Sequence, residues 1–191
     1  MKYFSLFLLC IFSVFGISGV YAENIRTDLS ENLLRLHIVA NSNSDVDQEI
    51  KLKVRDAILR NSIQQPTLSQ INATVSETLL NLGTDYGHKT QMLRRYVPEK
   101  EYKNIHLPEG LYNCINVVLG NGAGENWWCV AYPPLCFTEE VFGDLSAEGK
   151  LILEQKLSKE SFRAIVYNGN VNIRFKIVDE FLKLKNRLLQ K

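Results

Sequence analysis

The chain has almost no excess charge, with 22 lysines and arginines against 21 aspartates and glutamates in 191 residues. Proteins that bind nucleic acid or an anionic membrane through a broad surface carry a basic excess or a basic cluster, and this sequence has neither. It also has no internal repeat and no low-complexity linker. The composition therefore gives no reason to expect a nucleic-acid partner, a solenoid or a string of domains.

Motifs of several enzyme classes are missing as well. There is no His-Glu-x-x-His motif, no Asp-Thr-Gly motif and no serine in a nucleophile elbow. The run GNGAG at 120–124 lacks the Lys-Ser/Thr of a phosphate-binding loop, and we interpret it as a turn between strands. Asp45 and Asp47, near Asn41 and Asn43, lack the glycine and distal glutamate of a calcium loop, so we interpret them as helix-capping residues. We predict no cofactor and no metal.

The N-terminus carries the features of an export signal. Lys2 is followed by an apolar run without charge from Tyr3 to Val20, and the small residue Ala22 precedes Glu23. A basic start, an apolar core and a small residue at the cleavage position are typical of a secretory signal peptide. We predict cleavage after residue 22. The alternative is that residues 1–22 remain as a membrane anchor, since the run approaches the length of a spanning helix.

Cysteines are few, and three of the four lie after the predicted cleavage site. The spacing of Cys129 and Cys136 does not match the Cys-x-x-Cys of thiol oxidoreductases, and a structural zinc site needs two more ligands. In an exported protein this pair is predicted to form a disulfide, which stabilises a loop of this length by about 2.5 kcal/mol. Buried free thiols are the alternative. A cysteine nucleophile with a histidine partner also stays open, because such partners meet only in the fold.

Alternation and helical periodicity predict a single compact α+β domain at 23–191, with a small, mostly antiparallel sheet covered by helices. The predicted strands lie at 33–40, 88–97, 111–119 and 126–132. The predicted helices lie at 46–62, 67–82, 138–142, 146–157, 158–167 and 172–189. The last two predicted strands read as a β-hairpin with a glycine-rich connection. His37 lies within an apolar strand and is interpreted as a structural, hydrogen-bonded histidine.

The segment GENWWCVAYPPLCF at 124–137 is the most unusual stretch. It contains both tryptophans of the chain, two cysteines and a Pro-Pro pair. Because Trp127 and Trp128 are adjacent in a predicted strand, they are expected to point to opposite faces. One is expected to pack inside, while the other lies under a helix or at the surface. Tryptophan is also enriched at the centres of protein interfaces, so a contact role is a second interpretation.

Three segments resemble the stage II sporulation protein R family of endospore-forming bacteria. They are RLHIVANSNSDVDQEIKLKVRDAIL at 35–59, PEGLYNCINVVLGNGAGENWWCVAYPPLCF at 108–137 and VNIRFKIVDEF at 171–181. The chain departs from the family pattern at Asn43, where aspartate is usual, and at Cys114, where a small residue is usual. Neither departure falls within the defining NWWCV…PPLCF motif.

The resemblance implies a sporulation signal without catalysis of its own. Members are made in the forespore and exported into the space between the two membranes around it. There they activate a membrane-embedded aspartic protease of the mother cell, which cleaves the precursor of sigma factor E.

For this chain we expect the contact with the protease at Asn126, Trp127, Trp128, Pro133 and Pro134, with Cys129 and Cys136 holding the shape of the patch. The alternative function is a thiol-dependent enzyme of the cell envelope that uses Cys129 or Cys136.

Overall fold

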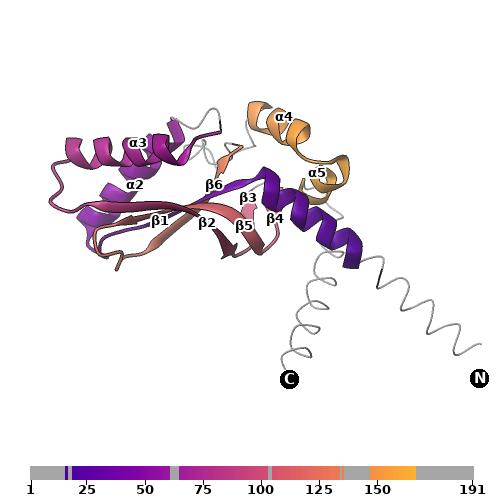
Figure 1. The fold of residues 1–191 in the computed structure, drawn as a ribbon, viewed down its shortest axis with the longest axis horizontal. Helices are drawn as coiled ribbons and strands as arrows, with labels where there is room; N and C mark the ends of the chain where they lie inside the picture. The colour runs from indigo at the N-terminus through magenta and orange to yellow at the C-terminus, as the bar shows by residue number, and fades with distance from the viewer. Residues whose placement is uncertain are drawn as a thin grey trace, which may run out of the picture.

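A four-stranded mixed sheet lies at the centre of the fold (Figure 1). The computed structural model describes residues 16, 19–60, 65–102, 105–133, 135 and 147–166. The strand order is β2-β5-β1-β6. The strands are β1 (Leu34–Val39), β2 (His88–Val97), β5 (Gly110–Leu119) and β6 (Asn126–Tyr132). The first strand runs parallel to β5 and antiparallel to β6, and β2 is antiparallel to β5. The predicted α+β fold with a mostly antiparallel sheet is confirmed.

The predicted hairpin between the last two strands is wrong. β5 and β6 are consecutive along the chain, but β1 lies between them and pairs with both. The glycine-rich loop therefore crosses the end of β1, and it is anchored there by backbone hydrogen bonds. The amide of Ala123 donates to the carbonyl of Asn41, and the amide of Gly124 donates to that of Ala40. Two neighbouring strand patterns with a short loop look the same in sequence whether or not a third strand separates them.

Two helices, α2 (Asp45–Arg60) and α3 (Leu68–Asn81), cover one face of the sheet (Figure 1). The acidic residues Asp45 and Asp47 lie in the first turn of α2 and Arg60 lies in the last, which complements the helix dipole. Thr67 and Gln70 form a capping box at the start of α3. Gly83 follows that helix with a φ of 66°, a conformation that glycine adopts without strain. Both helices were predicted from sequence.

The core between these helices and the sheet is apolar and closely follows the predicted periodicity. Its buried members come from alternate positions on the strands and from one stripe on each helix. They are Leu34, Leu36, Ile38, Val54, Ile58, Leu59, Ile71, Val75, Leu79, Ile115, Val117, Leu119, Cys129 and Ala131. Burial of each large apolar side chain contributes about 1.5–3 kcal/mol, so this layer fixes which sheet face is turned inward.

A second core cluster packs on the other sheet face, toward one end. It joins the N-terminal helix at 19–32 to α4 (Ala147–Lys156), α5 (Lys159–Ile165) and the small antiparallel pair β3 (Lys100–Tyr102) and β4 (Ile105–Leu107). Its buried residues are Ile25, Leu29, Leu33, Val97, Ile105, Leu107, Tyr112, Val130, Leu135, Leu153, Leu157 and Ile165. In Figure 1 these elements gather at the end of the sheet away from α3.

The N-terminal helix runs through the predicted cleavage position, and Ala22 is buried. Cleavage after that residue stays a prediction. Among the residues that the structure describes, no helix is long and apolar enough to cross a membrane. Pro98 and Glu99 connect β2 to β3, which begins at Lys100. The predicted helices at 138–142 and 172–189 lie outside the described residues.

Candidate functional site

The adjacent tryptophans Trp127 and Trp128 lie on opposite faces of the edge strand β6, as predicted. In the antiparallel register Trp127 is opposite Ile38, whose side chain faces α2 and α3. Trp128 is opposite His37, on the second face. The sequence-predicted patch is therefore divided between two sides of the sheet, because side chains alternate along a strand.

Trp127 is part of the helix-covered side. It is half-buried and packs against the first core cluster. The guanidinium of Arg55 from α2 lies over its ring, 4.4 Å from the centroid, and Asp56 pairs with that arginine at 2.7 Å. The indole Nε1 is buried and has no hydrogen-bond acceptor within the described part of the chain. These contacts make Trp127 a packing residue that seals the edge of the first core.

Trp128 stacks on a buried histidine on the second face. The centroids of the Trp128 and His37 rings are 3.9 Å apart and their planes are inclined by 22°. Trp128 is half-buried and also packs against the second core cluster. The guanidinium of Arg95, from strand β2, lies 5.3 Å from the Trp128 ring centroid. Three side chains from three strands thus form one stacked arrangement.

His37 is held by amide side chains at both ring nitrogens. Nδ1 lies within hydrogen-bond distance of Asn116 Oδ1, and Nε2 lies 2.7 Å from Asn126 Oδ1. The side chain is buried, and burial lowers the pKa of the ring despite these hydrogen bonds. A neutral imidazole has one N–H, so one amide must present its NH₂ group instead. The interpretation of His37 as a structural histidine agrees with this geometry.

The hydrogen bond from Arg95 to Asn116 determines which of the two amides presents its NH₂ group to His37. Its Nη1 donates to Asn116 Oδ1 at 3.1 Å and lies 3.3 Å from Nδ1 of His37. Asn116 Oδ1 is therefore committed as an acceptor for Arg95 and for an N–H at Nδ1 of His37. The Nε2 atom is then the acceptor of the neutral ring, which requires the Asn126 amide to turn its NH₂ group toward Nε2 in place of Oδ1. This network ties together all four strands of the main sheet.

Sequence reasoning missed Arg95 and Asn116, and it also missed Arg35. Asn116 is a polar residue inside an apolar strand, as His37 is, and both are buried. Two such residues in separate strands could have been paired as neighbours, and the register does place them opposite each other. Nothing in the sequence links Arg95 to His37 and Asn116. Arg95 is paired with Tyr112 in the strand register, and it contacts Asn116 only because its side chain is long.

The glycine loop and the polar segment after β1 clasp each other. Asn41 Oδ1 accepts from the amide of Asn121 at 2.9 Å, and Asn43 Oδ1 accepts from the amide of Glu125 at 2.8 Å. A β-carbon at Gly120 would collide with the Asn41 side chain, and one at Gly124 would collide with the backbone oxygen of Ser42. The glycines are required for this close approach. Asn43 therefore holds the residue that directly precedes the NWWCV motif.

The same polar segment starts α2, but the capping side chain is Ser44, whereas the sequence interpretation assigned the cap to Asp45 and Asp47. The hydroxyl of Ser44 accepts from the amide of Asp47 at 3.2 Å. The Asp47 carboxylate in turn accepts from Ser42, from Asn41 at 3.0 Å and from the hydroxyl of Tyr86 at 2.8 Å. These hydrogen bonds, that from Ser42 first, lower the pKa of Asp47. The described residues contain no group of three or more His, Cys, Asp or Glu side chains that could hold a metal ion.

The remaining predicted site residues lie deeper or outside the described residues. Pro133 is buried and follows a cis peptide bond from Tyr132. Cys129 is buried in the first core cluster. Pro134 and Cys136 lie outside the described residues, so the predicted disulfide is untested and stays a prediction.

The described residues do not assemble a thiol active site. Cys129 faces the first core, whereas His37 lies on the other side of the sheet. Cys114 lies on the side of His37 but is fully buried, and burial raises the pKa of its thiol to about 11. A thiol with that pKa is not a nucleophile near neutral pH. The arrangement around His37 is suited to positioning Trp128 and Arg95, which reach the surface.

Comparison with known proteins gives one family. The family model described as Stage II sporulation protein R matches residues 30–141. The protein Stage II sporulation protein R of Bacillus subtilis (strain 168) is 32% identical over 167 residues, which cover 74% of this chain and 75% of that protein. No solved structure matches the chain significantly.

Proposed function

Because the chain belongs to the stage II sporulation protein R family, we propose that it is an exported sporulation signal that activates a membrane-embedded aspartic protease. The protein leaves the forespore and acts in the space between the forespore and mother-cell membranes. The protease then cleaves the precursor of sigma factor E on the mother-cell side. The protein acts as a ligand and carries out no catalysis of its own.

The observation that best supports a binding role is the stacked arrangement of His37, Trp128 and Arg95. Tryptophan and arginine dominate the binding energy of protein interfaces, because they bury a large area and lose little entropy when they are already held in place. Trp128 is held from below by His37 at 3.9 Å, and Arg95 is held by Asn116 at 3.1 Å. The surface is thus pre-organised for a partner.

Activation by a ligand requires differential binding. A ligand shifts the protease toward its active state only if it binds that state more tightly than the resting one. A change from a mostly resting to a mostly active population takes about 5.5 kcal/mol of differential affinity. A rigid contact surface serves this purpose, because it fits one partner conformation and cannot adapt to both.

The test is reconstitution in a bacterium that does not sporulate. The full chain, the protease and the sigma-E precursor are co-expressed, and cleavage of the precursor is followed by immunoblotting. Cleavage should depend on both the protease and the chain, and a chain without residues 1–22, retained in the cytoplasm, should give none. Equal cleavage with and without the chain would contradict the proposal.

No structural observation favours the alternative of a thiol-dependent enzyme. Within the described part of the chain, Cys129 is buried in the apolar core on one face of the sheet, whereas His37 lies on the other face. If the thiol chemistry were nevertheless the activity, Cys129→Ser would abolish signalling even in a folded protein.

A further inference from the structure

We propose that Arg95 is an anchor for a carboxylate, and that the surface around Trp128 binds an acidic segment of the protein partner. The partner contributes an aspartate or glutamate whose two oxygens meet the free edge of the Arg95 guanidinium. This inference rests on the proposed function, since it identifies the chemistry by which the protease is recognised.

The guanidinium of Arg95 is held in place by contacts on one side, while its other edge makes no hydrogen bond to the described residues. Its Nη1 is occupied by Asn116, and its plane is placed over Trp128 at 5.3 Å. The Nε and Nη2 groups make no hydrogen bond within the described structure, and the residue is exposed. Two parallel N–H groups on one edge of a guanidinium match the spacing of carboxylate oxygens. The free edge is therefore a ready site for a bidentate partner.

The charges on this sheet face are of one sign. By register, the second face of the described sheet carries Lys89, Arg95 and Arg35, and no described acidic side chain shares it. The chain as a whole is close to neutral, with 22 basic and 21 acidic residues. Within the four strands, the charges on this face are therefore all positive, which favours an acidic partner beside Arg95.

Arg35 strengthens that potential from below. It is fully buried, and none of its three guanidinium nitrogens has a hydrogen-bond acceptor among the residues that the structure describes. The contact that the structure does give it is the ring of Tyr112, 5.2 Å from the guanidinium carbon. Burying an unpaired cation is costly, and a negative charge brought to the neighbouring Arg95 reduces that cost. Both guanidiniums act electrostatically on the Cys114 thiol, which places them in the same region.

A peptide carboxylate fits this surface better than a lipid phosphate does. Recognition of an anionic membrane takes a cluster of roughly four to eight lysines and arginines. The exposed cations on this face of the described sheet are Lys89 and Arg95. An aromatic platform beside a single forked cation is the arrangement that protein interfaces use for a buried charged contact. We therefore assign the acidic group to a protein.

The experiment measures binding of the purified full chain to the purified protease in detergent, at low and at raised salt. Arg95→Gln should weaken binding about tenfold or more, because close charge pairs at interfaces have large coupling energies. Arg95→Lys keeps the charge but not the fork, so it should stay clearly weaker than the wild type. Arg94→Gln is the matched control. It removes a charge that is also exposed, from the preceding position of β2 and on the opposite face, and should leave binding unchanged.

Salt dependence and vesicles complete the test. Raised salt should lower the affinity of the wild type for the protease more than it lowers the affinity of Arg95→Gln. Each protein is compared with itself at two salt concentrations, so a difference in stability between the variants does not affect the result. The inference is overturned if Arg95→Gln or Arg95→Lys binds the protease as tightly as the wild type does. It is overturned as well if Arg94→Gln weakens binding as much as Arg95→Gln does. It is also overturned if the chain binds phosphatidylglycerol vesicles through Arg95 and not the protease. A wild-type chain that binds neither contradicts the proposed function itself.

Discussion

Trp128 lies flat on His37, with ring centroids 3.9 Å apart. This contact joins the most distinctive motif of the chain to a buried histidine that lies 91 positions earlier in the sequence (128 − 37). It also explains why a polar residue occurs in the middle of an apolar strand. His37 is a support, fixed by two amides, on which an interface tryptophan rests.

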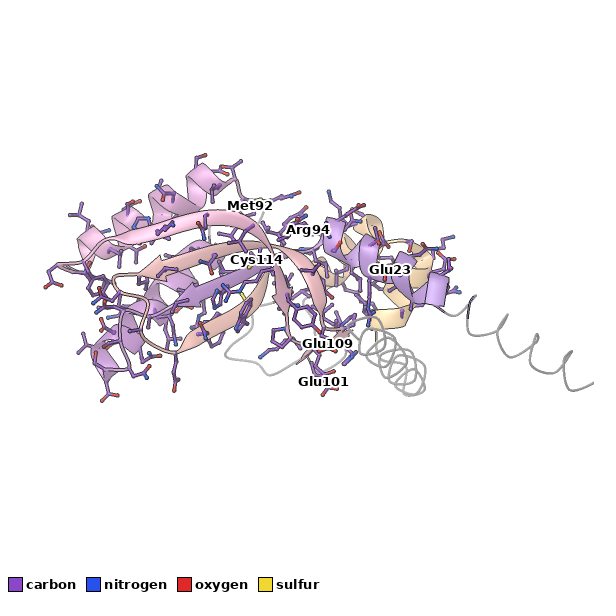
Figure 2. The ribbon with its side chains drawn as sticks, turned by 60° about the horizontal axis from the view of Figure 1, so that its bottom comes forward. Glu23, Met92, Arg94, Glu101, Glu109 and Cys114 are labelled. Carbon is purple, nitrogen blue, oxygen red and sulfur yellow. The ribbon has the colours of Figure 1, made fainter. Side chains whose placement is uncertain are left out.

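Figure 2 shows the sheet with α2 and α3 behind it and with Cys114 labelled near its middle.

The two tryptophans should have separable roles. Trp127→Ala removes packing against the first core and should cost about 3 kcal/mol of unfolding free energy. Trp128→Ala should cost about as much, because that side chain is also half-buried against a core cluster, but it should lower protease activation further. Denaturant unfolding and the co-expression assay measure the two effects. If activation simply follows stability in both variants, the contact role of Trp128 is wrong.

Stability should fall on mild acidification because of His37. Burial lowers the pKa of this ring below the ordinary value of 6.5, so the unfolded chain binds the proton first as pH falls. The contribution to stability is fully present above 6.5 and decreases as pH drops below it. Arg95 beside the ring adds to the cost of protonation.

The measurement is the unfolding free energy in urea at about pH 7.5 and about pH 5.5. The wild type should lose more stability between the two than His37→Gln does. The comparison between variants is needed because the pKa of His88 is also lowered, mainly by burial. Equal losses in the two proteins would show that His37 is not the titrating group.

The clasp between the glycine loop and the segment after β1 should tolerate no side chain at Gly124. Gly124→Ala drives a methyl group into the backbone of Ser42, so it should destabilise the protein by about 1–3 kcal/mol. Gly87→Ala is the matched control, since nothing lies within 4 Å of the added methyl there. Thermal unfolding of both variants checks this. A neutral Gly124→Ala would mean that the two loops do not meet closely.

Cys129 and Cys136 should be linked in the exported protein. Mass spectrometry of the secreted chain, non-reduced and reduced, should show two hydrogens gained on reduction, and the same spectra show whether residues 1–22 are removed. Cys114 should resist alkylation in the native protein, because it is fully buried and its thiol has a pKa raised to about 11. Rapid labelling of Cys129 in the non-reduced protein would contradict the bridge.

Much of the fold follows from local patterns in the sequence. The starts of α2 and α3, the helix stop at Gly83 and the bounds of β2 and β6 all depend on capping residues or alternation within a few positions. The strand order does not. Placing β1 between β5 and β6 depends on long-range packing and on the loop clasp, and the nearest-neighbour assumption gave a hairpin instead.

The site was predictable only in part for the same reason. The opposite directions of Trp127 and Trp128 follow from adjacency in a strand. The partner of Trp128 cannot be predicted in this way, because His37 lies opposite it only through the pairing of β1 with β6, which are far apart in the sequence. Arg95 is the residue that sequence could least reveal. Its role depends on a side chain that extends from the row of Tyr112 back to Asn116.

The most direct test of the central claim asks which face of the sheet touches the protease. A photo-crosslinking amino acid is placed at Lys89 or at Arg94, both exposed and both on β2, in the co-expressed full chain. Lys89 shares a face with Trp128 and Arg95, whereas Arg94 lies on the other face. If the face of Trp128 and Arg95 is the contact surface, position 89 gives a covalent adduct with the protease and position 94 gives none. An adduct from position 94 alone would contradict it.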